Sequence, residues 1–176
     1  MKKLLLLSAL LIFACSCDGS DNDDNSFNCN TVNSNLLVGS ESSNLCDGLV
    51  IDDIGNKNSI SLHSNSSDCF VDNVPNNETI ILFYQINSTV DGLEPGSYSL
   101  SGYSPAVGQF DFVTVIISGT SNTYYAETGS NGFLEIESVE ATSGGVDVVL
   151  RWEIISNDGT VITGSYEGGL QTCGEW

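Results

Sequence analysis

The single histidine of this 176-residue chain, His63, limits the catalytic chemistry that the sequence allows. Zinc sites built from several histidines, including the H-E-x-x-H arrangement, are excluded. A Ser-His-Asp triad needs only one histidine and stays open, but no Gly-x-Ser-x-Gly turn precedes a helical pattern and serine is abundant throughout. We therefore predict no catalytic residue and expect His63 on a strand, at the rim or surface of the fold.

Carboxylates are the most abundant ionisable groups, with 23 Asp and Glu against four Lys and Arg and a net charge of -19. A pair suited to glycoside hydrolysis, for instance Asp52 with Glu153, can be drawn from any acidic chain and is no specific signal. Asp47, Asp52 and Asp53 offer hard oxygen ligands close together in the sequence and are candidate calcium ligands, with a solvated turn as the alternative. No other cofactor is expected.

The shortage of basic residues excludes one class of partner. Only Lys57 and Arg151 lie beyond residue 3, so no basic patch can form and nucleic acid is not an expected ligand. Hydrophobic residues make up 40% of the chain. That fraction is enough for one core, and the length suits a single domain.

The N-terminus has the pattern of a secretory signal that ends in a lipidated cysteine. Two lysines precede residues 4–14, which are apolar except for Ser8 and too few to span a membrane. Small residues before Cys15 and Cys17 resemble a bacterial lipoprotein box. Lipid on Cys15 would leave an odd number of cysteines, whereas lipid on Cys17 leaves four. We predict a signal peptide over residues 1–16 and a lipid anchor on Cys17, with a cleaved signal without lipid as the alternative.

The four remaining cysteines are predicted to form two disulfides. They are Cys29, Cys46, Cys69 and Cys173, and no C-x-x-C pair of the kind that binds zinc occurs among them. Disulfides are typical of the oxidising envelope that a secretory signal implies. Of the three connectivities, we favour Cys46 with Cys69 and Cys29 with Cys173, because the second bond would tie the entering chain to the last strand.

Residues 17–35 are predicted to be a flexible tether. They are rich in Asp, Asn and Ser and have too few apolar residues to offset the entropy lost on ordering. The acidic run directly after Cys17 resembles the surface-export signal of Bacteroidota-type lipoproteins. That resemblance implies the outer membrane, with the domain facing the cell exterior; a solvated linker that faces the periplasm is the alternative.

Residues 36–176 are predicted to form one all-β domain. Short runs of Val, Ile, Tyr and Phe alternate with turn residues, and no helical period is sustained. Strands are predicted at residues 49–54, 59–64, 79–87, 97–103, 110–118, 122–127, 133–139, 146–155 and 161–170. The almost continuous apolar run 79–87 favours two packed layers. We predict an antiparallel β-sandwich of about nine strands, with an up-and-down β-barrel as the alternative.

Three segments resemble a pattern shared by small surface lipoproteins of Bacteroidota type. They are residues 48–56, 92–100 and 157–170, and the resemblance extends over most of residues 45–172. It implies a β-rich extracellular domain and brings no established activity or catalytic residue. The four mature cysteines depart from the usual pattern of this family.

Three functions are compatible with these features. We favour a surface-anchored, non-catalytic binding or interaction module whose partner is a glycan or an envelope protein. Its candidate stacking residues, for which cross-strand packing is the alternative role, are Tyr98, Tyr103, Tyr124, Tyr125 and Trp176. The other two functions are a hydrolase of extracellular polymer that uses paired carboxylates, and a small-ligand carrier, which requires a barrel with an apolar hollow.

Overall fold

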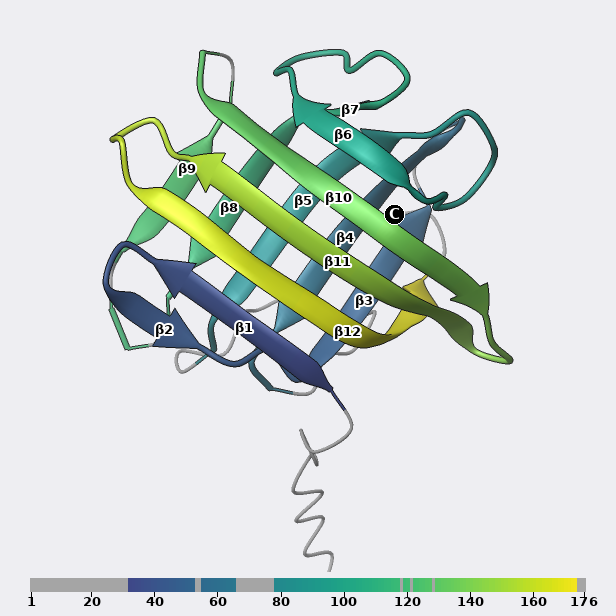
Figure 1. Ribbon diagram of the computed structural model, residues 1–176, viewed down its shortest axis with the longest axis horizontal. Coiled ribbons are helices and arrows are strands. Elements are labelled where there is room, and N and C mark those ends of the chain that lie inside the picture. The colour runs from purple at the N-terminus through teal and green to yellow at the C-terminus, as the bar shows by residue number, and fades with distance from the viewer. Residues whose placement is uncertain are drawn as a thin grey trace, which may run out of the picture.

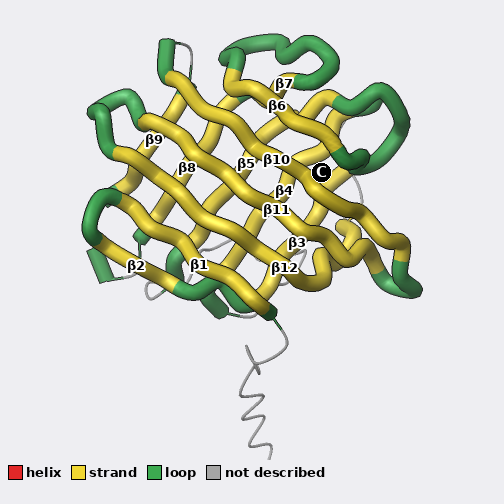
Figure 2. Tube along the Cα trace, viewed as in Figure 1, coloured by secondary structure: helices red, strands yellow, loops and turns green. Residues whose placement is uncertain are grey.

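A computed structural model describes residues 32–52, 55–65, 78–117, 119–120, 122–127 and 129–173. These residues form twelve β-strands and no helix, which confirms the all-β class (Figure 1, Figure 2). In this part of the chain, no helix is long and apolar enough to span a membrane. The strands are β1 Asn33–Val38, β2 Glu41–Ser43, β3 Asp47–Asp52, β4 Lys57–His63, β5 Ile80–Asn87, β6 Gly96–Leu100, β7 Gln109–Phe110, β8 Phe112–Ile116, β9 Thr123–Ala126, β10 Asn131–Ala141, β11 Gly145–Ile155 and β12 Val161–Cys173.

Eight strands close into a ring through their hydrogen bonds. Their order is β11-β10-β6-β7-β5-β4-β3-β12, and β12 pairs again with β11. The fold is therefore a closed β-barrel. β1 and β2 extend the sheet from β12, while β8 and β9 extend it from β5. Figure 1 shows β1, β12, β11 and β10 crossing in front of β3, β4, β5 and β8, so these two groups of strands form opposite walls.

The predicted β-sandwich is wrong, because short hydrogen-bonded corners join the two walls. β12 pairs with β11 over residues 161–171 and with β1 over residues 162–167, and residues 171–173 run parallel to β3. At the other corner, β7 joins β5 through one residue pair and β6 through two. Corners of this length leave no period in the sequence, so two separate layers and one closed barrel have the same pattern. The barrel alternative fits. Unlike a simple up-and-down barrel, it contains two parallel pairings, β12 with β3 and β6 with β7.

Large side chains fill the space between the two walls. On β11, Val148, Leu150, Trp152 and Ile154 are at most 3% exposed and alternate with outward-facing residues, as the predicted period of two requires. Phe83 of β5 packs edge-on against Trp152, with ring centroids 5.5 Å apart. An eight-stranded barrel is just wide enough for side chains to fill. The buried side chains of both walls form one hydrophobic core.

All nine predicted strands are present, and the last three form the predicted antiparallel meander. The sequence pattern misses β1, β2 and β7. β1 begins at Asn33, inside the predicted tether. The sequence pattern misses this strand because only Leu36 and Val38 of it join the core. Its other residues have the polar character of a linker. The predicted signal peptide, Cys17 and most of the tether lie outside the described residues.

Candidate functional site

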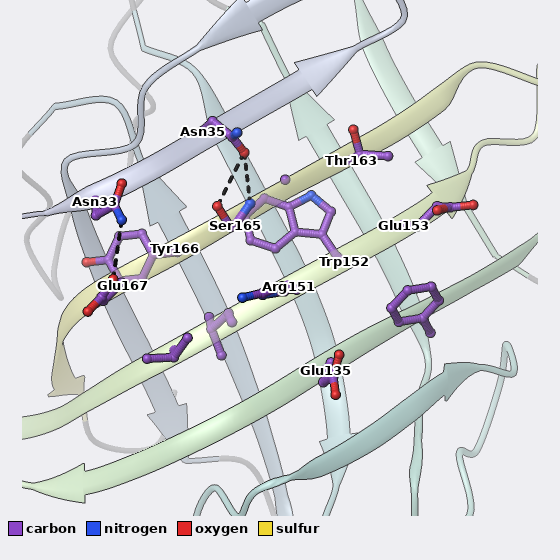
Figure 3. A pocket seen from close by; sticks show the side chains of 14 residues that line it. Asn33, Asn35, Glu135, Arg151, Trp152, Glu153, Thr163, Ser165, Tyr166 and Glu167 are labelled. Carbon is purple, nitrogen blue, oxygen red and sulfur yellow. Dashed lines mark hydrogen bonds between the residues drawn. The ribbon is translucent and has the colours of Figure 1, made fainter.

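The outer face of β10, β11, β12 and β1 carries an open groove of about 570 Å³, which we call the outer groove (Figure 3). Side chains alternate along each strand, so every second residue points away from the core. Cross-strand pairing sets these residues in rows, one of which contains Glu135, Arg151, Ser165 and Asn35. The groove is lined by Asn33, Asn35, Phe133, Glu135, Val149, Leu150, Arg151, Trp152, Glu153, Thr163, Gly164, Ser165, Tyr166 and Glu167.

Hydrogen bonds between β1 and β12 hold two amide side chains at one edge of the outer groove (Figure 3). The Oδ1 of Asn35 accepts from the backbone N–H of Ser165 at 3.0 Å and from the Ser165 hydroxyl at 3.4 Å. The Nδ2 of Asn33 donates to Oε2 of Glu167 at 3.3 Å. These bonds fix the amides in position, so this edge of the groove is polar and ordered by β12.

Negative charge dominates the outer groove. Glu135, Glu153 and Glu167 line it, and Arg151 is the one basic residue among the lining side chains. The Nε of Arg151 lies 2.6 Å from Oε1 of Glu137, in an ion pair whose side chains are 63% and 35% exposed. Such an exposed pair contributes little to stability, but it offsets the charge of Arg151. The groove therefore presents three carboxylates with little compensating positive charge.

Trp152 and Gly164 lie on the core side of the outer groove. The indole of Trp152 is buried, and its Nε1 has no hydrogen-bond partner among the described residues. A Cβ atom on Gly164 would lie 2.3 Å from Cζ2 of Trp152, so glycine is the residue that leaves room for the indole. Phe133 is 41% exposed and supplies apolar surface beside the carboxylates. The groove thus combines a rigid base with acidic, amide and apolar groups.

Tyr166 supports the base of the groove from within the barrel. Its hydroxyl donates to the carbonyl of Gly169 at 2.7 Å. Burial raises the pKa of Tyr166, and the nearby charges of Asp47 and Asp147 raise it further. The phenol is therefore a neutral hydrogen-bond donor with a structural role.

The structure does not bring the candidate calcium ligands together. Asp47 begins β3 and Asp52 ends it, and five residue steps along a strand span roughly 17 Å. Asp53 lies outside the described residues. Glu153, which we considered as a carboxylate partner for Asp52, is on β11, and β12 separates that strand from β3. Across the described part of the chain, no group of three or more His, Cys, Asp or Glu side chains could hold a metal ion.

Two of the predicted disulfide cysteines can be placed. Cys46 and Cys173 are both disulfide-bonded and both 4% exposed. The backbone N–H of Cys46 donates to the carbonyl of His63 at 2.6 Å, and His63 precedes Cys69 by six residues. Six residues are long enough to connect His63, which lies beside Cys46, to a cysteine bonded to Cys46, so the favoured Cys46–Cys69 bond is sterically possible. Cys69 itself and Cys29 lie outside the described residues, so the connectivity stays a prediction.

The single histidine belongs to a cluster that the sequence pattern did not predict. The Nε2 of His63 is 2.8 Å from Oγ of Ser61, and its Nδ1 is 2.8 Å from Oε1 of Glu78. Ser61 and His63 share the outer face of β4, whereas Glu78 precedes β5. Ser61 and His63 are two residues apart on a strand, which places both side chains on the same face, so the sequence could have predicted this pair. No sequence signal places Glu78, because its position depends on the pairing of β4 with β5.

The candidate stacking aromatics do not share one surface. Tyr98 is buried, and its hydroxyl donates to the carbonyl of Glu94 at 2.9 Å. Tyr103 and Tyr125 are 81% and 54% exposed, but Tyr103 follows β6 and Tyr125 belongs to β9, two strands that are not paired. Tyr124, also on β9, packs partly buried against the core. Trp176 lies outside the described residues.

Comparison with known proteins adds no guide to the site. No family model matches the chain, and no curated protein or solved structure matches it. The resemblance to Bacteroidota-type surface lipoproteins therefore stays a prediction, and the function of this barrel has to be argued from its own geometry.

Proposed function

We propose that the protein is a lipid-anchored binding module, displayed at the outer membrane, whose outer groove takes a basic segment of a partner polypeptide. The lipid on Cys17, the acidic tether and the outward orientation rest on the sequence pattern. The ligand class rests on one observation: Glu135, Glu153 and Glu167 line the groove together, while the charge of Arg151 is offset by Glu137.

Electrostatic complementarity favours a cationic ligand. The whole chain carries a net charge of -19, which attracts a basic partner toward the protein before contact. Within the groove, each exposed carboxylate that pairs with a lysine or arginine contributes about 0.2–1 kcal/mol. Phe133 can bury an aliphatic or aromatic side chain between these charges. The combination fits a short segment in which basic and apolar residues alternate.

A glycan is the less favoured ligand. Sugar recognition by stacking requires exposed aromatic rings, and Phe133 is the one exposed aromatic side chain among the described residues that line the groove. The amides of Asn33 and Asn35 can hydrogen-bond to hydroxyl groups, but each already bonds to β12. The three carboxylates match a cation better than a neutral sugar.

We propose that the groove binds without turnover. Hydrolysis by paired carboxylates needs one carboxyl that its surroundings keep protonated, typically by burial, whereas Glu135, Glu153 and Glu167 are all exposed on an open sheet face. The paired-carboxylate hydrolase therefore has no supporting geometry within the described residues.

The test compares two charge-matched triple variants of the full-length mature protein in detergent. One carries Glu135→Gln, Glu153→Gln and Glu167→Gln in the groove. The control carries Glu41→Gln, Asp52→Asn and Asp91→Asn, three exposed carboxylates outside the groove. The probe is a peptide of alternating lysine and phenylalanine, and its dissociation constant is measured by fluorescence anisotropy at about 0.15 M salt.

Loss of three carboxylate contacts at about 0.2–1 kcal/mol each predicts a dissociation constant raised by roughly 3-fold to 150-fold in the groove variant, because 1.4 kcal/mol corresponds to a factor of ten. The control variant should change the constant by less than about threefold, since it alters only the long-range field. Equal weakening in both variants would show that net charge, and not the groove, attracts the peptide.

A further inference from the structure

The Ser61–His63–Glu78 cluster lies outside the outer groove, on the other wall of the barrel. Ser61 and His63 face outward from β4, which packs between β3 and β5. The two contacts of the imidazole are both 2.8 Å long. Ser61 is 8% exposed, His63 12% and Glu78 4%, so the serine and the imidazole keep limited contact with solvent while the carboxylate is almost enclosed.

One tautomer of a neutral His63 satisfies both of its hydrogen bonds. An ionised Glu78 has only acceptors, so Nδ1 of His63 must be the donor in the contact with Oε1. In the neutral imidazole, Nε2 is then an acceptor, and the hydroxyl of Ser61 donates to it. This is the arrangement in which an imidazole can take the proton of a serine hydroxyl as that oxygen attacks an electrophile.

We propose that Ser61 is a nucleophile activated by His63, with Glu78 as the positioning residue, and that it accepts the acyl group of a small apolar ester. Oγ of Ser61 would form a bond to the carbonyl carbon as its proton passes to Nε2 of His63. The bond from that carbon to the leaving oxygen then breaks, and this oxygen takes the proton from His63. Water attacks the acyl-serine by the same proton path, which releases the acid and restores Ser61.

The neighbours of Ser61 indicate the substrate class. Ser61 lies directly opposite Leu49 of β3 on one side and Leu82 of β5 on the other, so leucines flank its hydroxyl. Ile51 lies one row further along β3 on the same face, and Leu49 and Ile51 form a small apolar cluster apart from the main core. Apolar walls and a serine that is 8% exposed favour a short alkanoyl group over a bulky or charged one.

If the cluster had only a structural role, Ser61 would not be reactive. The function of the cluster would be to join the start of β5 to the end of β4, where the backbone N–H of Thr79 also donates to Oγ of Ser64 at 2.9 Å. That function needs His63 and Glu78 but does not make Ser61 reactive. The proposal goes beyond ligand binding and does not depend on the outer groove, so either can fail without the other.

The experiment uses a fluorophosphonate reagent, which forms a stable bond from its phosphorus to an activated serine oxygen and releases fluoride. The full-length mature protein is labelled in detergent, and the modified peptide is identified by mass spectrometry. Variants Ser61→Ala, His63→Gln and Glu78→Gln are compared with Ser59→Ala, which removes a hydroxyl from the same face of β4. Thermal melts identify the variants that fold.

We expect one adduct per molecule, located on Ser61, that is absent in Ser61→Ala, unchanged in Ser59→Ala and at least tenfold slower to form in His63→Gln. Glu78→Gln should slow labelling even at temperatures at which its thermal melt shows the variant to be folded. Hydrolysis of a short p-nitrophenyl ester should follow the same order. Absence of an adduct, an adduct on another residue of the folded wild-type protein, or equal labelling of urea-unfolded protein would overturn the proposal, and these three results need no variant.

Discussion

Gly164→Ala should destabilise the barrel where β12 passes between β11 and β1. A Cβ atom at this position would lie 2.3 Å from Cζ2 of Trp152 and 2.4 Å from the backbone oxygen of Asn35. Both distances are far below van der Waals contact. The indole is held by core packing, including the edge-on contact with Phe83, and the Asn35 carbonyl belongs to the ladder between β1 and β12. Neither neighbour can move alone.

The expected magnitude follows from these two clashes. Inserting one methyl group into a packed core costs about 1–3 kcal/mol, and a clash with backbone places Gly164→Ala near the upper end. For a domain of this size, roughly 3 kcal/mol corresponds to a fall in melting temperature of about 6–12 °C. Gly144→Ala is the matched control, because a Cβ atom there would meet nothing within 4 Å. It should be neutral or stabilise by about 0.4–1 kcal/mol.

Urea denaturation of both variants, followed by tryptophan fluorescence and far-UV circular dichroism, measures the two free energies of unfolding. The double variant Trp152→Phe with Gly164→Ala extends the test, since phenylalanine lacks the Cζ2 atom that clashes. Its loss of stability should be smaller than the sum of the two single losses. Equal stability of Gly164→Ala and Gly144→Ala would refute the placement of the indole against β12.

Three further predictions concern the anchor, the disulfides and one turn. Cys17→Ser should release the protein in soluble form, and retention in the membrane fraction would contradict lipidation at this residue. Digestion without reduction should yield a peptide pair that links Cys46 to Cys69, whereas a link from Cys46 to Cys29 would reject the favoured connectivity. In the turn after β11, the hydroxyl of Ser156 lowers the pKa of Asp158, so the stability that Asp158 contributes is present above its unfolded pKa of about 3.9 and is lost as pH falls through the lower folded pKa. The difference in melting temperature between wild type and Asp158→Asn should therefore shrink from about pH 6 to pH 3, and a constant difference would contradict this sign.

The three long strands β10, β11 and β12 show what the sequence could predict. β10, β11 and β12 alternate apolar and polar residues over long stretches, so their existence, pairing and inward faces follow from a period of two. The outward position of Glu135 and Arg151 follows from the same period. The closure of the barrel could not be predicted, because it depends on corners of one to three residue pairs.

The two candidate sites show where sequence reasoning stops. The outer groove needs β1 beside β12, and the polar residues of β1 have the composition of a linker. The Ser61–His63 pair lies on one strand and was within reach of the pattern, but Glu78 arrives from a separate segment through the pairing of β4 with β5. In both cases the missing information is contact between segments whose own composition does not reveal the partner.

The most direct test of the proposed binding function is to locate the lysine–phenylalanine peptide on the protein. Backbone amide resonances of the isotope-labelled protein are followed by NMR while the peptide is added. The outer groove predicts the largest shift changes at Asn35, Arg151 and Ser165, which form one row across β1, β12 and β11. Largest changes on β4, β5 or β8, or small changes spread evenly over all acidic loops, would contradict the groove as the binding surface.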